Sequence, residues 1–300
     1  MRQSRFERVL LSWGFALALP LGLAAQQAQT PGASQPEGPT DSDISCAGYF
    51  SHRAPDLGIF VMGSEDGGLK NEFADRDYIY LSRGSGAAAA PGAEYMLVRP
   101  VKDVNPREVF SGQQRLLAEM GTLYAQIARV RVVALHEGSS SAVIVHSCEG
   151  VTAGDLAIAI PPRPALRYRS TSAVDRFAPV SGKPTGVVVV TKDFRVGVGK
   201  GEIVYLNLGR NQGAQAGQYA RIYRGYRTGF NSVFEEITSN YSTDINGYPM
   251  GRKLSAAERA ALPRSVLGEV LLLSVEDNSA TGIVTFSREE ILLGDQAELE

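Results

Sequence analysis

Hydrophobic residues in this chain occur in short runs, and glycine-rich turns separate most of the runs. This spacing predicts β-strands joined by tight turns, because strands need few residues and glycine supplies the turn conformations. The first half predicts a short helix near 113–120 and strands at 58–62, 77–81, 95–98, 130–135, 142–145 and 156–160. The second half predicts strands at 186–190, 203–206, 219–223, 270–275 and 283–286, and a closing strand after 295.

The two halves repeat one another. At a constant offset of 125, Tyr80, Leu81, Gly84 and Gly92 return as Tyr205, Leu206, Gly209 and Gly217. At an offset of 140, Val130, Ser139, Ser147, Glu149, Gly154 and Asp155 return as Val270, Ser279, Ser287, Glu289, Gly294 and Asp295. The identities fall on turns and the apolar matches on strands, as expected when a backbone is kept while side chains diverge. We therefore predict a mainly β protein of two tandem, internally duplicated domains, each a small barrel or sandwich, with one or two short helices in connections.

The same pattern divides the chain into segments. Residues 1–25 read as a cleavable export signal, because three arginines precede an apolar run and small residues follow it. An uncleaved N-terminal anchor is the alternative. Residues 26–45 are rich in Gln, Pro, Ser and Gly, which predicts a flexible leader. We expect the first β-domain at 46–162, a linker with the first edge of the second domain at 163–185, and the second β-domain at 186–300.

The second half also carries an insertion, placed at 225–266, that is aromatic and basic. Its candidate partner-binding residues, with two just before it, are Tyr223, Arg224, Tyr226, Arg227, Phe230, Phe234 and Tyr241. Such residues are enriched at the centres of protein interfaces, and their rings can also stack on sugars. Alternatively, they cover their own domain. The insertion ends in a predicted helix with a capping box between Ser255 and Glu258, stopped by Pro263.

Cys46 and Cys148 are the only cysteines. In an exported chain an even pair favours a disulfide, here between the start of the first domain and its last hairpin. The second half has Arg288 where the first has Cys148, so the bridge would belong to the first domain alone. Two free buried thiols are the alternative.

Neither the net charge nor any sequence motif indicates a nucleic-acid, nucleotide, metal or catalytic site. The formal net charge of −2 becomes −4 without residues 1–25, and this mild acidity argues against nucleic acid. The glycines at 197–201 resemble a phosphate loop, but neither Ser nor Thr follows the Lys, so a turn is predicted. His136 and His146 match no metal-binding spacing. Asp155 and Asp295 could form a carboxylate pair, but turn chemistry explains a Gly-Asp in each half better. We predict no catalytic residue, metal or cofactor.

A family resemblance rests on the second half. Its pattern consists of 204–209, the Gly217 turn, Gly268 with Val270, and Gly294-Asp295. This resembles the C-terminal domain of flagellar assembly protein T, a periplasmic component of a ring around the basal body, and similar domains follow LysM modules in other bacterial envelope proteins. The resemblance implies a periplasmic β-domain that docks onto an envelope assembly.

These observations predict a non-enzymatic, periplasmic or secreted scaffold protein of the bacterial cell envelope. Its partner would be an envelope protein complex, and homo-oligomer formation is left open. The structural turns would be formed by Gly84, Gly92, Gly154, Asp155, Gly209, Gly217, Gly294 and Asp295. The alternative is a module that binds peptidoglycan or another polysaccharide through the aromatic insertion.

Overall fold

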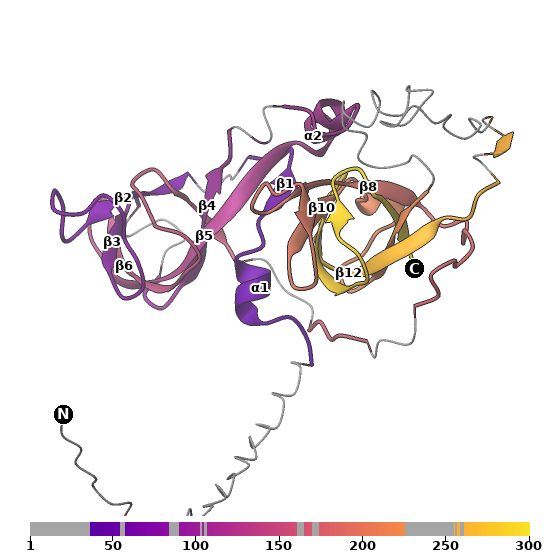
Figure 1. The fold of residues 1–300 in the computed structure, drawn as a ribbon. Helices are drawn as coiled ribbons and strands as arrows, with labels where there is room; N and C mark the ends of the chain where they lie inside the picture. Colours follow the sequence, from indigo (N-terminus) through magenta and orange to yellow (C-terminus); the bar gives the residue numbers. More distant parts are fainter. Residues whose placement is uncertain are drawn as a thin grey trace, which may run out of the picture. The chain divides into compact units, whose positions relative to one another are not determined.

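A computed structural model describes residues 37–54, 58–83, 90–102, 104, 107–160, 165–169, 174–225, 255, 257–258 and 261–300. Their strands form two closed six-stranded β-barrels, one after the other along the chain (Figure 1). The named α-helices are α1 (Asp41–Ser45) and α2 (Gln113–Met120). The predicted duplicated, mainly β fold is therefore confirmed. No helix among the described residues is long and apolar enough to cross a membrane.

The first barrel is antiparallel throughout. Its strands are β2 (Ile59–Ser64), β3 (Tyr78–Leu81), β4 (Glu94–Pro100), β5 (Thr122–Leu135), β6 (Ser140–Ser147) and β7 (Leu156–Ala159). Around the barrel they run β5-β4-β7-β2-β3-β6, and β6 pairs back with β5. The short strand β1 (Tyr49–Ser51) pairs with the start of β5, opposite Thr122–Tyr124 in register.

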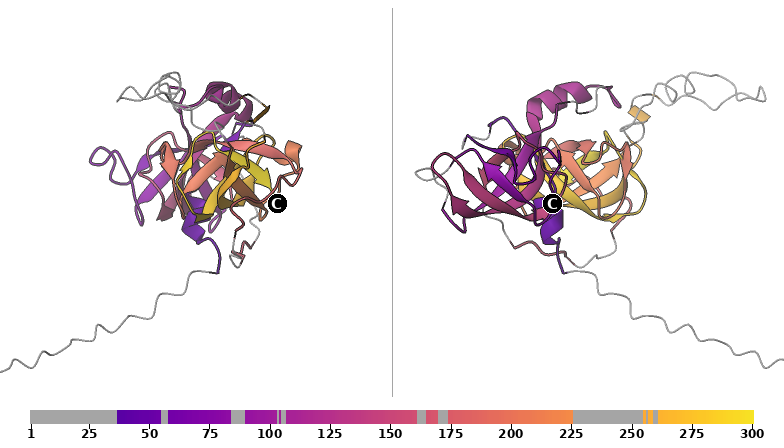
Figure 2. Two further views of the ribbon diagram at one scale, coloured as in Figure 1. Left: turned by 45° about the vertical axis from the view of Figure 1, so that its right-hand side comes forward. Right: turned by 90° about the vertical axis from the view of Figure 1, so that its left-hand side faces the viewer.

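The second barrel repeats this plan (Figure 2). Its strands are β8 (Thr185–Thr191), β10 (Ile203–Leu206), β11 (Tyr219–Arg224), β12 (Ser265–Val275), β13 (Ala280–Ser287) and β15 (Gln296–Leu299). They close in the order β10-β13-β12-β11-β15-β8, which is the order of their counterparts in the first barrel. A 3-10 turn at Arg210–Gln212 follows β10, and β9 (Gly197–Val198) pairs with β14 (Ile291–Leu292).

The repeat extends to single hydrogen bonds. The Gly92 N–H donates to the Val132 carbonyl at 2.8 Å, and the Gly217 N–H donates to the Leu272 carbonyl at the same distance. In the pairing of β2 with β3 a bulge lies between Val61 and Gly63, and the corresponding pairing of β8 with β10 is irregular at the corresponding place. Equivalent positions of the two barrels therefore have equivalent backbone surroundings.

Each barrel has its own apolar interior, but the second interior is not built from the second repeat alone. Phe110, from the connection between β4 and α2, is buried among Val188, Leu206 and other interior residues of the second barrel. A residue of the first repeat therefore belongs to the hydrophobic core of the second barrel.

Most expected elements are present with small shifts, and three expectations need correction. Residues 26–45 are not wholly a leader, because Thr40 and Asp43 form a capping box that begins α1, and Ile44 packs beside the buried Ala47. The strands expected at 130–135 and 270–275 begin earlier, at Thr122, where pairing with β1 extends the strand, and at Ser265. The expected helix at 113–120 is α2. The loop at 197–201 contains the predicted turn, and a short strand that was not predicted, β9, precedes it.

Candidate functional site

Each barrel contains a buried carboxylate held by an arginine at its Gly-Asp turn. Asp155 accepts hydrogen bonds from Arg99 Nε at 2.7 Å and Nη2 at 2.8 Å. Asp295 accepts from Arg224 Nε at 2.7 Å and Nη2 at 2.6 Å. Each carboxylate also accepts a backbone N–H of its own turn. The predicted turn chemistry is confirmed, and each carboxylate is neutralised within its own barrel instead of forming an acid–base pair.

The second of these pairs shows the cost of burying charge. Burial raises the pKa of Asp295, while the hydrogen bonds from Arg224 and the Leu292 N–H act in the opposite direction. Removing the arginine would leave a fully buried carboxylate unpaired, which proteins rarely tolerate. The pair is therefore best explained as the fastening of the last strand to β11.

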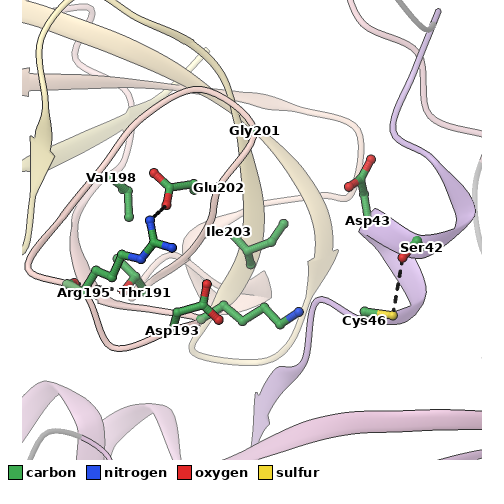
Figure 3. Close-up of a pocket in the computed structure, with 11 residues that line it drawn as sticks. Ser42, Asp43, Cys46, Thr191, Asp193, Arg195, Val198, Gly201, Glu202 and Ile203 are labelled. Atoms are coloured by element: carbon green, nitrogen blue, oxygen red, sulfur yellow. Dashed lines mark hydrogen bonds and ion pairs between the residues drawn. The ribbon is translucent and has the colours of Figure 1, made fainter. Parts of the chain in front are cut away.

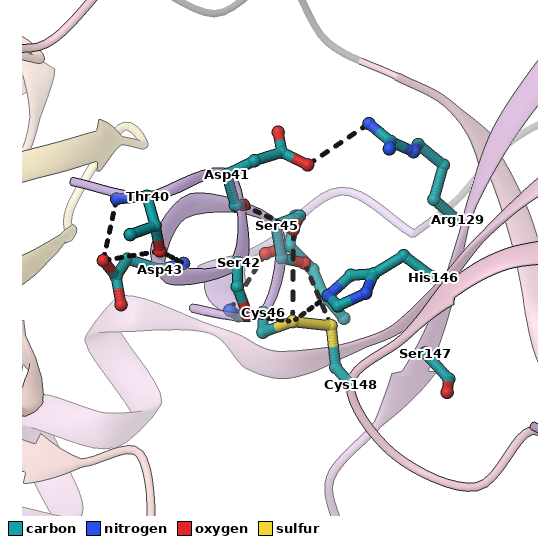
Figure 4. The surroundings of a disulfide bond; sticks show 12 residues. Thr40, Asp41, Ser42, Asp43, Ser45, Cys46, Arg129, His146, Ser147 and Cys148 are labelled. Carbon is teal, nitrogen blue, oxygen red and sulfur yellow. Dashed lines mark hydrogen bonds and ion pairs between the residues drawn. A yellow bond between two sulfur atoms is a disulfide. The ribbon is translucent and has the colours of Figure 1, made fainter. Parts of the chain in front are cut away.

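The two cysteines form a disulfide, as predicted, with 5.4 Å between their Cα atoms. His146 Nε2 lies 3.7 Å from Cys46 Sγ, and Arg129 pairs with Asp41 of α1 nearby (Figure 4). The two sulfurs and the imidazole are close enough to share a metal ion. However, a metal needs thiolates, and in the disulfide both sulfurs are already bonded to each other. The site therefore serves as a covalent link between α1 and the end of β6.

A polar cavity of about 270 Å³ lies between α1 and the loops of the second barrel (Figure 3). Its charged groups are largely used by the loop itself. Glu202 accepts from Arg195 Nη1 at 2.5 Å and from the Gly199 N–H at 2.6 Å, and the Thr191 hydroxyl donates to the Arg195 carbonyl. These contacts explain the shape of the loop and do not assemble a nucleophile with a base.

A second cavity of about 210 Å³ is lined by residues of both barrels, among them Arg99, Glu149 and Tyr205. Tyr205 is its most buried ionisable group, and burial raises the pKa of its hydroxyl. That hydroxyl donates to the Ala47 carbonyl at 2.7 Å. Tyr205 therefore holds the segment after the disulfide in place.

The predicted partner-binding residues are only partly described. Tyr223 is buried, with the guanidinium of Arg264 4.2 Å from its ring centre, and Arg224 is held by Asp295. Both are engaged within the second barrel. The remaining predicted residues, Tyr226, Arg227, Phe230, Phe234 and Tyr241, lie outside the described residues.

The predicted turn glycines fall into two groups, with Gly84 outside the described residues. Gly92, Gly154, Gly217 and Gly294 have φ between 85° and 96°, which favours glycine. Gly209 is extended instead, with φ of −115°. Its small size is needed for another reason, because a Cβ there would lie 2.3 Å from the Asp277 carbonyl oxygen.

The most distinctive surface is the outer face of four neighbouring strands of the first barrel, β2, β3, β6 and β5. Its large apolar side chains are exposed: Phe60, Met62, Tyr78, Tyr80 and Val133. We call these five residues the open face. Four of them alternate with buried residues along β2 and β3. An antiparallel sheet with one solvated face normally carries polar residues outward, so this face is typical of a docking surface.

The corresponding face of the second barrel is covered by the chain itself. Met62, Tyr80 and Val133 are 55%, 37% and 43% exposed, whereas their counterparts Val189, Tyr205 and Leu273 are 0%, 2% and 3% exposed. Partly buried residues, among them Val104, Leu166 and Tyr168, add to the cover. The fully buried covering residues come from two segments, 46–51 and 116–123, and include Phe50, Leu117, Met120 and Leu123. We call these two segments the covering edge.

The open face was not among the residues predicted from sequence, although a signal was present. Residues 59–62 are apolar at every position, and 78–81 likewise lack a polar alternate. For a strand with one wet face this pattern is unusual, and it indicates that both faces are meant to be covered. No protein-family model matches this chain, and no curated protein sequence matches it significantly.

Proposed function

We propose that this protein is a non-enzymatic scaffold of the bacterial cell envelope that binds another protein through the open face of its first barrel. The observation that carries the proposal is the exposure of this apolar face beside a covered counterpart. Exposed apolar patches on folded proteins usually mark interaction sites. Tyr and Phe, which the face presents, are also favoured at interface centres.

Two further features support this assignment. The disulfide fits an oxidising compartment, in line with the export signal expected from residues 1–25. In addition, the ionisable groups with the strongest contacts serve structure: Asp155 and Asp295 fasten turns, and Tyr205 fastens the covering edge. The resemblance to flagellar assembly protein T agrees with a docking role, and we propose an envelope protein complex as the binding partner.

The test is a pull-down from solubilised envelope with the exported chain as bait. Val133 on the open face and Val196 in a loop of the second barrel are both 43% exposed, which provides a matched pair. We expect defined proteins with the unchanged chain and with Val196→Lys, and their loss with Val133→Lys and Met62→Lys. Circular dichroism confirms that each variant is folded. Recovery that does not differ between the variants contradicts the proposal. Recovery of the tagged bait without envelope proteins and without untagged copies of the chain contradicts it as well.

Co-sedimentation with purified peptidoglycan sacculi separates protein binding from glycan binding. A scaffold that binds protein stays in the supernatant. If the chain pellets with sacculi and the Met62→Lys variant pellets equally, the binding site is a glycan site elsewhere, and the proposal is wrong.

A further inference from the structure

Among the described residues, the large exposed apolar side chains fall into two surface sets, apart from three in loops. One set is the open face of the first barrel. The other lies at the start of β12 and consists of Phe177, Val180 and Leu262. The three in loops are Leu69, Phe194 and Val196. Two separate apolar sets on one chain raise the question of whether they fit each other.

The contact between the two barrels shows how such a face is covered. Phe50 of the covering edge packs edge-on against the Tyr205 ring, with 5.3 Å between ring centres. Backbone carbonyls of the same segment accept hydrogen bonds from the second barrel: Ala47 from the Tyr205 hydroxyl and Gly48 from the Thr281 hydroxyl. A Cβ on Gly48 would lie 2.8 Å from the Tyr205 oxygen, so the segment fits closely.

The open face has the same geometry as the face covered in this contact. Tyr80 pairs with Ser141 on β6, as Tyr205 pairs with Thr281 on β13. Each pair therefore presents an outward tyrosine hydroxyl beside a smaller hydroxyl, on equivalent strands. The Ser141 hydroxyl lies 2.8 Å from His136 Nε2 and is therefore engaged within its own barrel. The first barrel thus keeps the tyrosine donor that binds a backbone carbonyl in the second barrel, and the apolar residues around it.

The second set of exposed residues occupies the place that β1, one part of the covering edge, has in the first barrel. In the first barrel, β1 runs along the start of β5, with Tyr49 opposite Tyr124. In the second barrel, residues 176–179 run along the start of β12: the Val266 N–H donates to the Arg176 carbonyl at 2.8 Å, and Arg264 Nε donates to the Ala178 carbonyl at 3.0 Å. Phe177 and Val180 lie on this segment, and Leu262 lies just before β12. We call Phe177, Val180 and Leu262 the distal edge.

We infer that a second copy of this chain docks head to tail: the distal edge of one copy covers the open face of the next and repeats the contact between the barrels. This inference rests on the proposed function, because it names the partner at the same face. The two surfaces differ, so the contact is heterologous. Such a contact builds an open chain of molecules unless its rotation closes a ring. In it, the Tyr80 hydroxyl donates to a backbone carbonyl of the neighbouring copy.

Sedimentation velocity over a range of concentrations tests the inference with the exported chain and four variants. The unchanged chain and Val196→Lys should form species that grow beyond a dimer as concentration rises. Met62→Lys on the open face and Phe177→Lys on the distal edge should each weaken association at least about tenfold, because each places a charge in an apolar contact. Tyr80→Phe should weaken it less, because only the hydroxyl is lost.

Mixing two variants gives the sharper result. Met62→Lys keeps an intact distal edge and Phe177→Lys keeps an intact open face, so an equal mixture has one productive contact per pair. We expect a dimer that grows no further, at concentrations at which each variant alone is monomeric. Association of Phe177→Lys like the unchanged chain, or a mixture that stays monomeric, overturns the inference.

Failure of the inference and failure of the proposed function can be told apart. If the unchanged chain is monomeric at every concentration, while Met62→Lys still loses envelope proteins in the pull-down, the open face binds a different protein and only the inference is wrong. If copies of the chain associate only after residues 26–36 are deleted, those residues cover the open face in the unchanged chain, and the inference as stated is also wrong.

Discussion

Replacing Phe110 should destabilise the second barrel although this residue belongs to the first repeat. Phe110 is only 9% exposed and lies within the interior of the second barrel, against which Val109 and Leu116 also pack. Its ring is so close to the last turn that a Cβ on Gly294 would lie 3.1 Å from it. Truncating a buried Phe to Ala typically costs about 3–5 kcal/mol. Domains of this kind have total stabilities of about 5–15 kcal/mol, so Phe110→Ala should remove a large part.

Urea unfolding followed by circular dichroism measures this effect. With a dependence on urea of about 1–3 kcal/mol/M, the midpoint should fall by at least about 1 M. Phe194→Ala is the matched control, because that ring is 40% exposed and should matter little. Hydrogen exchange then shows where stability is lost. The substitution should accelerate amide exchange in β11 and β15 more than in β3. A cost below about 1 kcal/mol, or faster exchange confined to the first barrel, would refute the packing argument.

Three further predictions follow from single contacts. Arg76 has a φ of 74°, a conformation that favours glycine, and Gly201 with a φ of 90° stands at the equivalent position of the second barrel. Arg76→Gly should therefore raise the free energy of unfolding by about 0.5–1 kcal/mol, and Gly201→Arg should lower it. Urea titration measures both changes. Burial alone would raise the pKa of Glu298, but Arg264 and the Ser181 N–H outweigh it and lower the pKa. The stability that this carboxylate contributes is therefore present above its unfolded pKa of about 4.3 and is lost as pH falls through the lower folded pKa. The melting temperature of the Glu298→Gln variant should therefore fall less steeply with decreasing pH than that of the unchanged chain. An equally steep fall would contradict this. The cysteines of the disulfide are 102 residues apart, so reducing the bridge should lower the free energy of unfolding by about 4–5 kcal/mol. Urea titrations with reductant and without it measure the difference. No difference would show that the bridge constrains neither the folded nor the unfolded state.

The fold was predictable because its signals are local and repeated. Glycine turns and short apolar runs locate the strands, and an offset that stays constant across a whole window requires a shared backbone. The helix at 113–120 and the capping box between Ser255 and Glu258 were likewise visible, and both backbone–side-chain hydrogen bonds of that box are present. Thr122–Arg129 was missed as strand. Its first three residues pair with β1, which lies far back in the sequence in a segment too short to predict, and the rest pair with β4, which extends beyond the strand expected at 95–98.

The candidate site was less predictable for a physical reason. Sequence alone shows which residues are apolar, but it does not show which apolar face is covered by another segment. Tyr80 and Tyr205 occupy equivalent positions and differ only because the covering edge reaches one of them. Tyr223 and Arg224 illustrate the opposite case: their composition is typical of an interface, yet Arg264 and Asp295 hold both within the barrel. Exposure depends on long-range packing, which composition does not report.

The position of the disulfide explains why one contact would be permanent and the other reversible. Cys46 directly precedes Ala47 and Gly48, whose carbonyls bind the second barrel, so the bridge to Cys148 fixes the covering edge covalently. In the second barrel Arg288 replaces the cysteine and donates to the Val174 carbonyl at 3.1 Å. The distal edge is thus held by noncovalent contacts, among them the ion pair between Arg176 and Glu289 at 3.0 Å, which contribute far less than a covalent link. A contact within the chain that must persist is cross-linked, whereas an edge that meets a partner is left free to adjust.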